Sequence, residues 1–312
     1  MSQGPLMVLD SAGLWFRAFH SVPEKITGPD GSPANAVRGF CDMVAVLVDE
    51  YSPTGLVAGL DRAWRPDWRV ELLPSYKAHR VGDDGEEDAP ASLGPQVESI
   101  RGILGAAGIA QAWAEDAEAD DVLAALAARD REVLVVTGDR DLFQLASAST
   151  TVVYVGAGMK KRLAYTPEVV AERFDLPAGD DAHVYADYAV LVGDASDGLP
   201  GVAGVGAKTA AALLREYGDL DGIVAAAGDP GSALTARQRT AITEGADYLS
   251  AARGVVRLGG RAFDVRFEGD VDGRRTPSAC ESAGCAASTT RATEAPLALE
   301  TTSDPASGSI TA

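Results

Sequence analysis

The sequence is short of positive charge, cysteine and histidine. Its 312 residues include 27 Lys and Arg against 46 Asp and Glu, a formal net charge of −19, so the composition alone argues against a nucleic-acid partner. Three cysteines are too few for a disulfide framework, and we expect a reducing, cytoplasmic location. The histidines, His20, His79 and His183, have no partner at metal-ligand spacing, and we assign them no chemistry.

Long hydrophobic runs are also missing. No apolar stretch approaches the roughly 18 residues that cross a membrane, and no basic region precedes an apolar core in MSQGPLMVLD, so we expect neither a membrane segment nor a signal peptide. Short apolar runs that suit strands lie at 6–9, 55–60, 131–136 and 149–155. Helical spacing is found in 34–51, 98–108 and 118–130. This alternation predicts an α/β fold with a parallel sheet covered on both faces.

Sequence pattern divides the chain into three parts. Residues 1–165 hold the alternating pattern, 166–268 are helical, and 269–312 are rich in Ala, Ser, Thr and Gly without a sustained period. We therefore predict an α/β core, a smaller helical module and a disordered tail, which is either a genuine terminus or the product of a shifted reading frame. No feature indicates oligomerisation, and we expect a monomer.

Many acids stand where predicted elements begin or end. They are Asp10, Asp61, Glu118, Asp120, Asp121, Asp139, Asp141, Asp194 and Asp197. Any one of them is explained more simply as a cap or loop residue, but ligands of parallel sheets bind beyond the carboxyl ends of the strands, where several would meet. Converging carboxylates repel unless a cation lies among them, and oxygen ligands without His or Cys favour Mg²⁺ or Mn²⁺. Two such ions about 4 Å apart can hydrolyse a phosphodiester.

A glycine-rich loop, LPGVAGVGAKTA, follows the last two acids. Gly201, Gly204 and Gly206 let the backbone approach a ligand closely, and a helix starting near Ala207 offers free N–H groups to an anion, with Lys208 in its first turn. A tight turn between two helices is the alternative, and it is favoured for the loop considered in isolation. The loop lacks the P-loop pattern and does not follow a strand.

The basic residues are few, and one group is notable. If SYKAHR (75–80) is helical, Tyr76, Lys77 and Arg80 share a face that suits a base stacked beside a phosphate. An ordinary solvated helix face is an equal alternative. Arg17 lies seven residues after Asp10 and could reach the same phosphate.

Together these stretches resemble the 5′→3′ exonuclease and flap-endonuclease family, most closely the bacterial 5′-nuclease domain found ahead of DNA polymerase I. The similar stretches are LMVLDSAGLWFRAFH, GLD, LLPSYKAHR, EADDVLAALA, VTGDRDLFQL and GDASDGLPGVAGVGAKTAAALL. They follow the family's order over residues 6 to about 255. The resemblance implies a PIN-like α/β nuclease core with an arch at about 74–92, and a helix–three-turn–helix module that binds duplex DNA. No polymerase domain fits in the remaining residues, so we expect a stand-alone nuclease.

The resemblance also implies roles for the residues above. Acids around a first metal ion would be Asp10, Asp61, Glu118, Asp120 and Asp139. Asp141, Asp194 and Asp197 would lie nearer a second ion, with Asp121 shared. Tyr76, Lys77, Arg80 and Arg17 would engage the terminal nucleotide and scissile phosphate. The duplex backbone would be held by Gly201, Gly204, Gly206, Lys208 and Thr209, with K⁺ in the glycine loop.

The implied activity is structure-specific 5′→3′ exonuclease and flap-endonuclease hydrolysis by a two-metal mechanism. Two Mg²⁺ ions are expected, with Mn²⁺ able to substitute. The implied substrates are DNA with a 5′ end or flap beside a duplex, and primer RNA paired to DNA. A catalytically weak junction-binding protein is the alternative, although no metal-binding acid is missing. A PIN-like ribonuclease is a third candidate, against which the glycine loop argues.

Two departures from the family pattern bear on these expectations. The second-metal motif commonly ends in Asn where this chain has Gly198. The arch segment VGDDGEEDAP is acidic, and we expect it to be disordered without DNA and to discourage long flaps.

Overall fold

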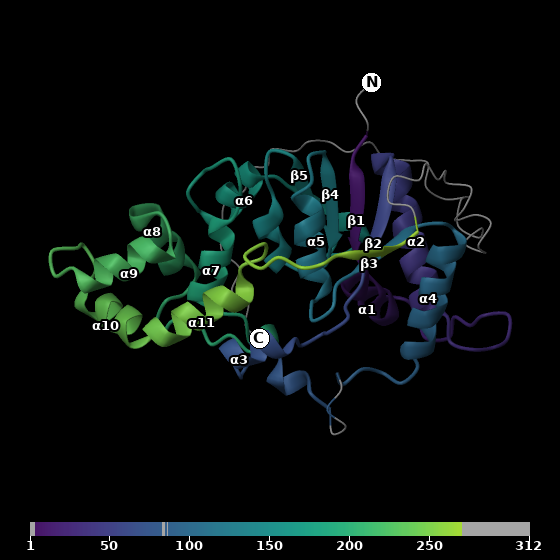
Figure 1. Cartoon of the computed structure of the whole chain (residues 1–312), viewed down its shortest axis with the longest axis horizontal. Coiled ribbons are helices and arrows are strands. Elements are labelled where there is room, and N and C mark those ends of the chain that lie inside the picture. Colours follow the sequence, from purple (N-terminus) through teal and green to yellow (C-terminus); the bar gives the residue numbers. More distant parts are fainter. Residues whose placement is uncertain (1–3, 83–84, 86, 270–312) are drawn as a thin grey trace.

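The computed structural model describes residues 4–82, 85 and 87–269. Within these residues the strands form a seven-stranded sheet in the order β6-β5-β4-β1-β2-β3-β7, with helices on both faces (Figure 1). The strands are β1 (Leu6–Asp10), β2 (Gly55–Gly59), β3 (Ala110–Trp113), β4 (Val133–Thr137), β5 (Thr150–Tyr154), β6 (Leu163–Tyr165) and β7 (Arg266–Glu268). The five strands from β5 to β3 are parallel, which agrees with the predicted fold, and the two edge strands are antiparallel.

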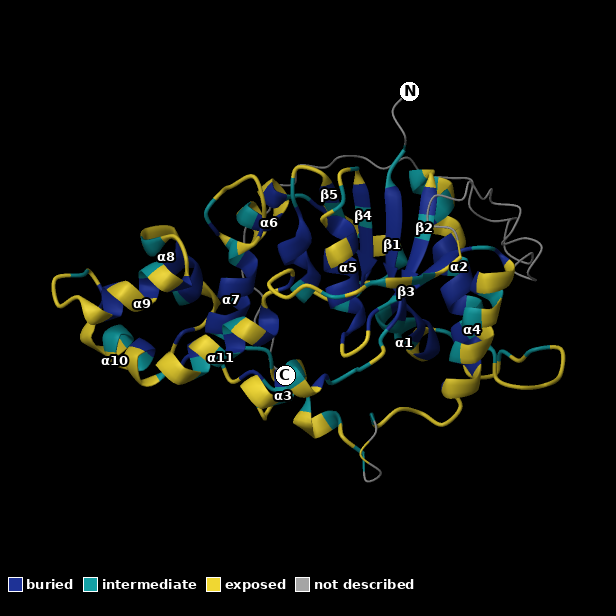
Figure 2. Ribbon diagram, in the orientation of Figure 1, coloured by how far each residue is buried: buried dark blue, intermediate teal, exposed yellow. Residues whose placement is uncertain are grey.

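The central strand β1 is buried on both faces. Because strand side chains alternate, Leu6 and Val8 pack on the side of α5 (Ala119–Ala127), while Met7 and Leu9 pack against the other helices. Those helices are α1 (Ser11–Ser21), α2 (Asn35–Tyr51) and α4 (Gly94–Ala106). Figure 2 shows the buried strands between helices whose outer faces are exposed. Because helices cover both faces of the parallel sheet, the ends of its strands are the part left accessible to a ligand.

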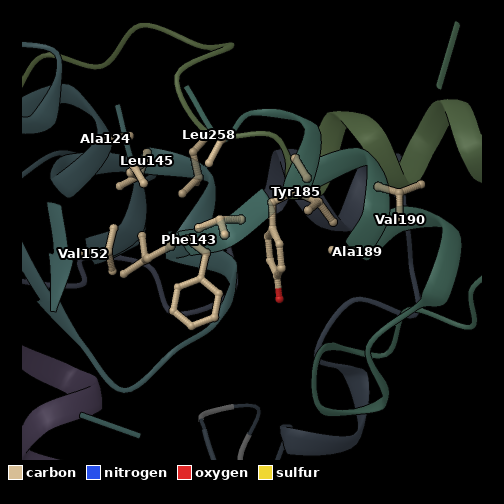
Figure 3. Close-up of a cluster of buried hydrophobic side chains, with 14 of the residues drawn as sticks. Ala124, Phe143, Leu145, Val152, Tyr185, Ala189, Val190 and Leu258 are labelled. Atoms are coloured by element: carbon tan, nitrogen blue, oxygen red, sulfur yellow. The ribbon is translucent and has the colours of Figure 1, made fainter. Parts of the chain in front are cut away.

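The helical module is α6 (Pro167–Phe174), α7 (Val184–Val192), α8 (Ala207–Tyr217), α9 (Leu220–Gly228), α10 (Ala236–Glu244) and α11 (Ala246–Val256). It shares one continuous hydrophobic core with the sheet. Phe143 follows β4, and its ring stacks on Tyr165 with ring centroids 4.0 Å apart. It also meets Tyr185 of α7 edge-on, with centroids 5.5 Å apart (Figure 3). This shared core fixes the glycine loop relative to the strand ends.

Some elements differ from the prediction. Strand β3 is four Ala-rich residues without β-branched side chains, so the apolar pattern does not reveal it. Strand β7 belongs to the core sheet, although we placed residues 166–268 in the helical module. Among the described residues, no helix is both long and apolar enough to cross a membrane. The expected tail lies outside the described residues, apart from Gly269.

Candidate active site

A cleft of about 940 Å³ lies at the carboxyl edge of the sheet. Its acidic lining includes Asp10, Asp61, Glu118, Asp120, Asp139 and Asp194 from the predicted set, together with Glu87 from the arch. Arg17, Lys77 and Arg80 line it as well. Asp141 and Asp197 are not in the lining, but both interact electrostatically with Asp139. The strand order therefore brings together acids that are far apart in the sequence.

Asp10 is fixed by the end of β1 and the start of α1. Its Oδ1 accepts a hydrogen bond from the Gly13 amide at 3.0 Å, and its Oδ2 accepts one from the Thr137 hydroxyl at 2.7 Å. A Cβ at Gly13 would lie 2.3 Å from Oδ2, so this close approach requires glycine. Thr137 ends β4, the neighbour of β1, and also accepts from the Asp139 amide at 2.8 Å. Thr137 thus holds two candidate metal ligands in place.

Glu118 is the N-cap of α5 and projects into the cleft. Its carboxylate accepts hydrogen bonds from Arg69 Nη1 at 2.5 Å and from the Tyr76 hydroxyl at 2.9 Å, and it also pairs with Lys77. Asp61 lies beside it and accepts from the Ala119 amide at 2.7 Å. Both carboxylates are therefore oriented before any ligand binds.

Arg69 of α3 (Asp67–Leu72) is a positioning residue that the sequence analysis missed. Its side chain is 2 % exposed and contacts Asp121 through two hydrogen bonds of 2.7 and 2.8 Å, besides its bond to Glu118. Its Nε also donates to the Val255 carbonyl at 3.1 Å. In this structure Asp121 is a partner of Arg69 and does not line the cleft, which differs from the expected role shared between the two metal ions.

The segment 75–80 is not the α-helix that we considered. Lys77 has a left-handed backbone with φ of 49°, and a short 3-10 turn spans Ala78–Arg80. Tyr76 is 5 % exposed with its hydroxyl on Glu118, so in this conformation its ring cannot stack on a base. Arg80 contacts Asp197 Oδ1 at 2.8 Å and the Ser196 carbonyl at 2.6 Å. The arch-base cations are therefore bound to the acids of the cleft.

The arch itself is partly described. Asp83, Asp84 and Glu86 lie outside the described residues. Val81 pairs with Glu87 in an isolated antiparallel bridge, and the Asp88 amide donates to the Arg80 carbonyl at 2.9 Å. These backbone contacts join the two ends of the segment, and its expected disorder without DNA stays a prediction.

Gly198 allows the arch base to pack on the loop that carries Asp194 and Asp197. It has φ of +73°, and a Cβ there would lie 2.1 Å from the Ser75 carbonyl oxygen. The Ser75 hydroxyl donates to the Gly198 carbonyl at 2.9 Å, and the Lys77 amide donates to the Asp197 carbonyl at 3.0 Å. The departure from Asn thus has a structural reason, because any larger residue would push these two segments apart.

Replacing Gly198 by Ala is expected to separate the arch base from this loop. A side chain at positive φ with a backbone clash is destabilising by about 1–3 kcal/mol. Chemical denaturation measures the loss, and amide exchange at residues 75–80 reports the separation. Gly102→Ala is the matched control, because a Cβ at this helical glycine meets nothing within 4 Å, so this variant should be as stable as the parent or more so. Equal effects of the two changes would contradict this account.

One face of α1 also lines the cleft. Gly13, Phe16, Arg17 and His20 recur at helical spacing and face Asp10 and the arch base. Arg17 therefore lines the same cleft as Asp10, and its contact with a phosphate stays a prediction. His20 was assigned no chemistry because we sought metal-ligand spacing, whereas its periodicity with Phe16 and Arg17 could have placed it on the face that α1 turns to the cleft.

The electrostatics indicate uncompensated negative charge. Burial raises the pKa of Asp61 to about 7 and that of Asp197 to about 6. Burial, and then the charge of Asp139, raise the pKa values of Asp120 and Asp141 well above the usual range. Although burial alone would lower it, the pKa of Lys77 is raised by the adjacent Glu118. Hard divalent cations suit such an oxygen-only set, although no three acids of the described residues converge closely enough here to coordinate one ion.

Stability of the metal-free protein is expected to fall as pH rises from about 5 to about 8. The pKa of Asp61 is 3.8 when unfolded and about 7 when folded, so the folded state holds more protons in this window and rising pH favours unfolding. One pKa unit corresponds to about 1.4 kcal/mol, so the loss should exceed about 2 kcal/mol. The melting temperature in EDTA measures it, and Mg²⁺ should restore stability most at the higher pH. A higher melting temperature at pH 8 than at pH 5 in EDTA would contradict this.

The glycine loop forms a second, separate pocket of about 630 Å³. Gly201 and Gly204 have positive φ, and the Gly201 amide donates to the Tyr248 hydroxyl at 3.1 Å. Arg237 of α10 approaches Gly204 across this pocket. Helix α8 begins at Ala207 after Gly206, with Lys208 exposed and Thr209 half-buried in its first turn. Lys208 and Arg237 thus lie at a loop with glycine backbone, and anion binding there stays a prediction.

A parallel sheet with an acidic cleft at its carboxyl edge, joined to a helical module with a glycine loop, defines a nuclease of the α/β class. Residues 5–175 match the family model described as "5′-3′ exonuclease, N-terminal resolvase-like domain". Residues 181–272 match "5′-3′ exonuclease, C-terminal SAM fold". The chain therefore belongs to the 5′-3′ exonuclease family. The predicted fold, family and class of activity are confirmed, and the roles of individual residues stay predictions.

Similar proteins agree with this membership. A 5′-3′ exonuclease of Mycobacterium tuberculosis is 48 % identical over 267 residues, covering 82 % of this chain and 84 % of that protein. DNA polymerase I of Mycobacterium bovis is 40 % identical over 240 residues, which cover 74 % of this chain and 25 % of that protein. In fold, the chain is similar to the bacteriophage T5 flap endonuclease solved with DNA and metal ions, with a TM-score of 0.61, 19 % identity, and coverage of 91 % and 94 % of the two chains.

Proposed function

We propose that this chain removes nucleotides from DNA 5′ ends and cuts 5′ flaps beside a duplex, and that it also removes primer RNA paired to DNA. The acidic cleft, with its arginine and lysine side chains, carries the proposal, since it offers sites for cations and for a phosphate at the same strand ends. The similar T5 enzyme is named a flap endonuclease and was solved with DNA and metal ions, which supports both parts.

We further propose two Mg²⁺ ions, with Mn²⁺ able to substitute. Asp10, Asp61, Glu118, Asp120 and Asp139 would hold the first ion. Asp141, Asp194 and Asp197 lie nearer the helical module and would serve the second. When bound, such ions stabilise charge on the phosphodiester and lower the pKa of an attacking water. Asp121 is left out of this set because both its oxygens are bonded to Arg69.

The cations of the cleft have a separate role in this proposal. Lys77 and Arg80 are paired with Glu118 and Asp197 in the free chain, and an incoming phosphate competes for both. Arg17 lies on α1 and can contact the adjacent phosphate. Exchange of an acid for a phosphate keeps each cation paired, and Glu118 retains its bond to Arg69.

The glycine loop is proposed to hold the duplex backbone. Gly204 and Gly206 would present amides, Gly201 shapes the turn with its amide on Tyr248, Lys208 and Thr209 follow, and K⁺ is proposed at the loop. Because this binding depends on contacts with phosphates, its affinity should fall steeply as the salt concentration rises. We also propose that the protein acts as a monomer in the cytoplasm.

The test is a 5′-labelled flap duplex incubated with Mg²⁺ or with EDTA, followed by sizing of the products. Mg²⁺-dependent cuts at or near the base of the flap support the proposal. Retained binding without cleavage would instead support the junction-binding alternative, and Gly198 would then be the first position to examine.

A further inference from the structure

A third cavity, of about 520 Å³, lies between α3 and α11 and is separate from the cleft. Arg69 lies between the two, because it bonds to Glu118 in the cleft and to Asp121 in the lining of this cavity. Helix α11 presents its opposite side to the glycine-loop pocket through Tyr248. None of the roles proposed above uses this cavity.

Its charge is opposite to that of the chain as a whole. Arg253, Arg257 and Arg261 line it, whereas the acid in the lining, Asp121, is neutralised by Arg69. Arg253 is already paired with Asp221 at 2.5 Å. Arg257 and Arg261 form no ion pair within the described part of the chain. Arg261 lies over the rings of Trp68 and Phe263, and Arg257 interacts with Asp187 only electrostatically. Two guanidinium groups without an ion pair among the described residues, at one concave surface of a protein of net charge −19, make a site for an anion.

The opposite wall is aromatic and apolar. Trp68 lines the cavity with its ring fixed by a 3.0 Å hydrogen bond from Nε1 to the Asp116 carbonyl. The Arg69 guanidinium lies 4.4 Å and the Arg261 guanidinium 5.2 Å from the ring centroid, so a ligand would meet the indole beside Arg261. Leu72 beside it is 44 % exposed. An indole next to arginines is the combination that holds a base beside its phosphate. The volume lies within the range of about 300–1,000 Å³ found for small-ligand sites.

We propose that this cavity binds one unpaired nucleotide, with the phosphate on Arg257 and Arg261 and the base or sugar against Trp68 and Leu72. A duplex has no free base face to offer this wall, so a single strand or a free nucleotide is the ligand. The proposal rests on the proposed function in so far as its ligand is nucleic acid. It assigns single-strand affinity to a surface outside the cleft.

The experiment compares a cavity variant with a control variant. The cavity variant is the double substitution Arg257→Ala/Arg261→Ala, and the control is Arg129→Ala/Arg173→Ala, which removes the same charge. Both control arginines also lie over aromatic rings, at 5.2 Å from Phe267 and 5.9 Å from Tyr165, and neither lines the cavity. Affinities for a short oligothymidylate and for thymidine 5′-monophosphate are measured in EDTA over a range of salt. The cavity variant should bind the oligonucleotide about tenfold more weakly. Its log-affinity slope against log salt should fall by about 0.7, since one phosphate on a single strand contributes about 0.7.

Each outcome decides the proposal. Weakened binding in the cavity variant alone supports it, and the monophosphate arm then shows whether a free nucleotide suffices or a strand is needed. Equal loss in both variants, or no loss in either, overturns it. Flap cleavage in Mg²⁺ is measured separately and should stay within about twofold of the parent for the cavity variant. A parent protein that does not cleave would refute the proposed function without bearing on the cavity.

Discussion

Asp139→Asn is expected to lower Mg²⁺-dependent flap cleavage by about a thousandfold or more. Asp139 is exposed in the cleft, follows β4, and influences the pKa values of Asp10, Asp120 and Asp141. Loss of its charge removes a ligand from the proposed site, and metal-ion stabilisation of a transition state is worth several kcal/mol, or about tenfold for every 1.4 kcal/mol.

The amide keeps the local fold, because Asn retains the oxygen that accepts from the Asp141 amide at 2.9 Å. Single-turnover rates on a labelled flap duplex measure the effect, and binding in EDTA should not weaken. Asp180→Asn, which changes an exposed acid outside the cleft, serves as the control and should cleave normally. A rate for Asp139→Asn within tenfold of the parent would remove Asp139 from the metal site.

Much of the fold could be predicted from the sequence, because buried parallel strands leave short apolar runs that end in polar residues. LMVL before Asp10 and the run before Asp139 are of this kind, and their carboxyl ends meet at one edge. Short edge elements could not be predicted. Strands β6 and β7 have three residues each, and their pairing depends on tertiary contact rather than on local pattern.

The acids of the site could be predicted from the sequence, but their ion pairs and hydrogen bonds could not. Periodicity gave no sign that Arg69 would be buried against Glu118 and Asp121, since a single arginine in a short helix looks like a solvated residue. Tyr76 was also misplaced, because we expected it on an accessible helix face and the structure buries it. Its spacing from Arg80 suggested a shared helical face, but the left-handed turn at Lys77 directs its ring inward. Side-chain direction at such turns depends on contacts distant in sequence.

The ion pairs around the cleft explain how an acidic chain can bind an anionic substrate. Three acids near the cleft have a counter-charge: Asp121 pairs with Arg69, Glu118 with Lys77 and Arg69, and Asp197 with Arg80. Arg69 is buried and cannot leave its partners without cost, whereas Lys77 and Arg80 are partly exposed and can exchange them. The buried pair therefore builds the site, and the exposed pairs are those that a phosphate can displace.

Arg69→Met tests this division and should lower the free energy of unfolding by about 3–5 kcal/mol, because it leaves the buried Asp121 carboxylate without its cation. Denaturation in EDTA measures the loss. Arg38→Met removes an exposed pair with Asp42 and should cost less than about 1 kcal/mol.

Adding Asp121→Asn to Arg69→Met separates charge from packing. The amide still accepts from the Glu118 backbone N–H at 3.1 Å, so the start of α5 keeps its cap while one unpaired charge is removed. The double variant should therefore be more stable than Arg69→Met alone, and the cycle gives the coupling energy. If instead the double variant loses the sum of both single effects, the two residues do not stabilise each other, and Asp121 would be free to serve the cleft after all.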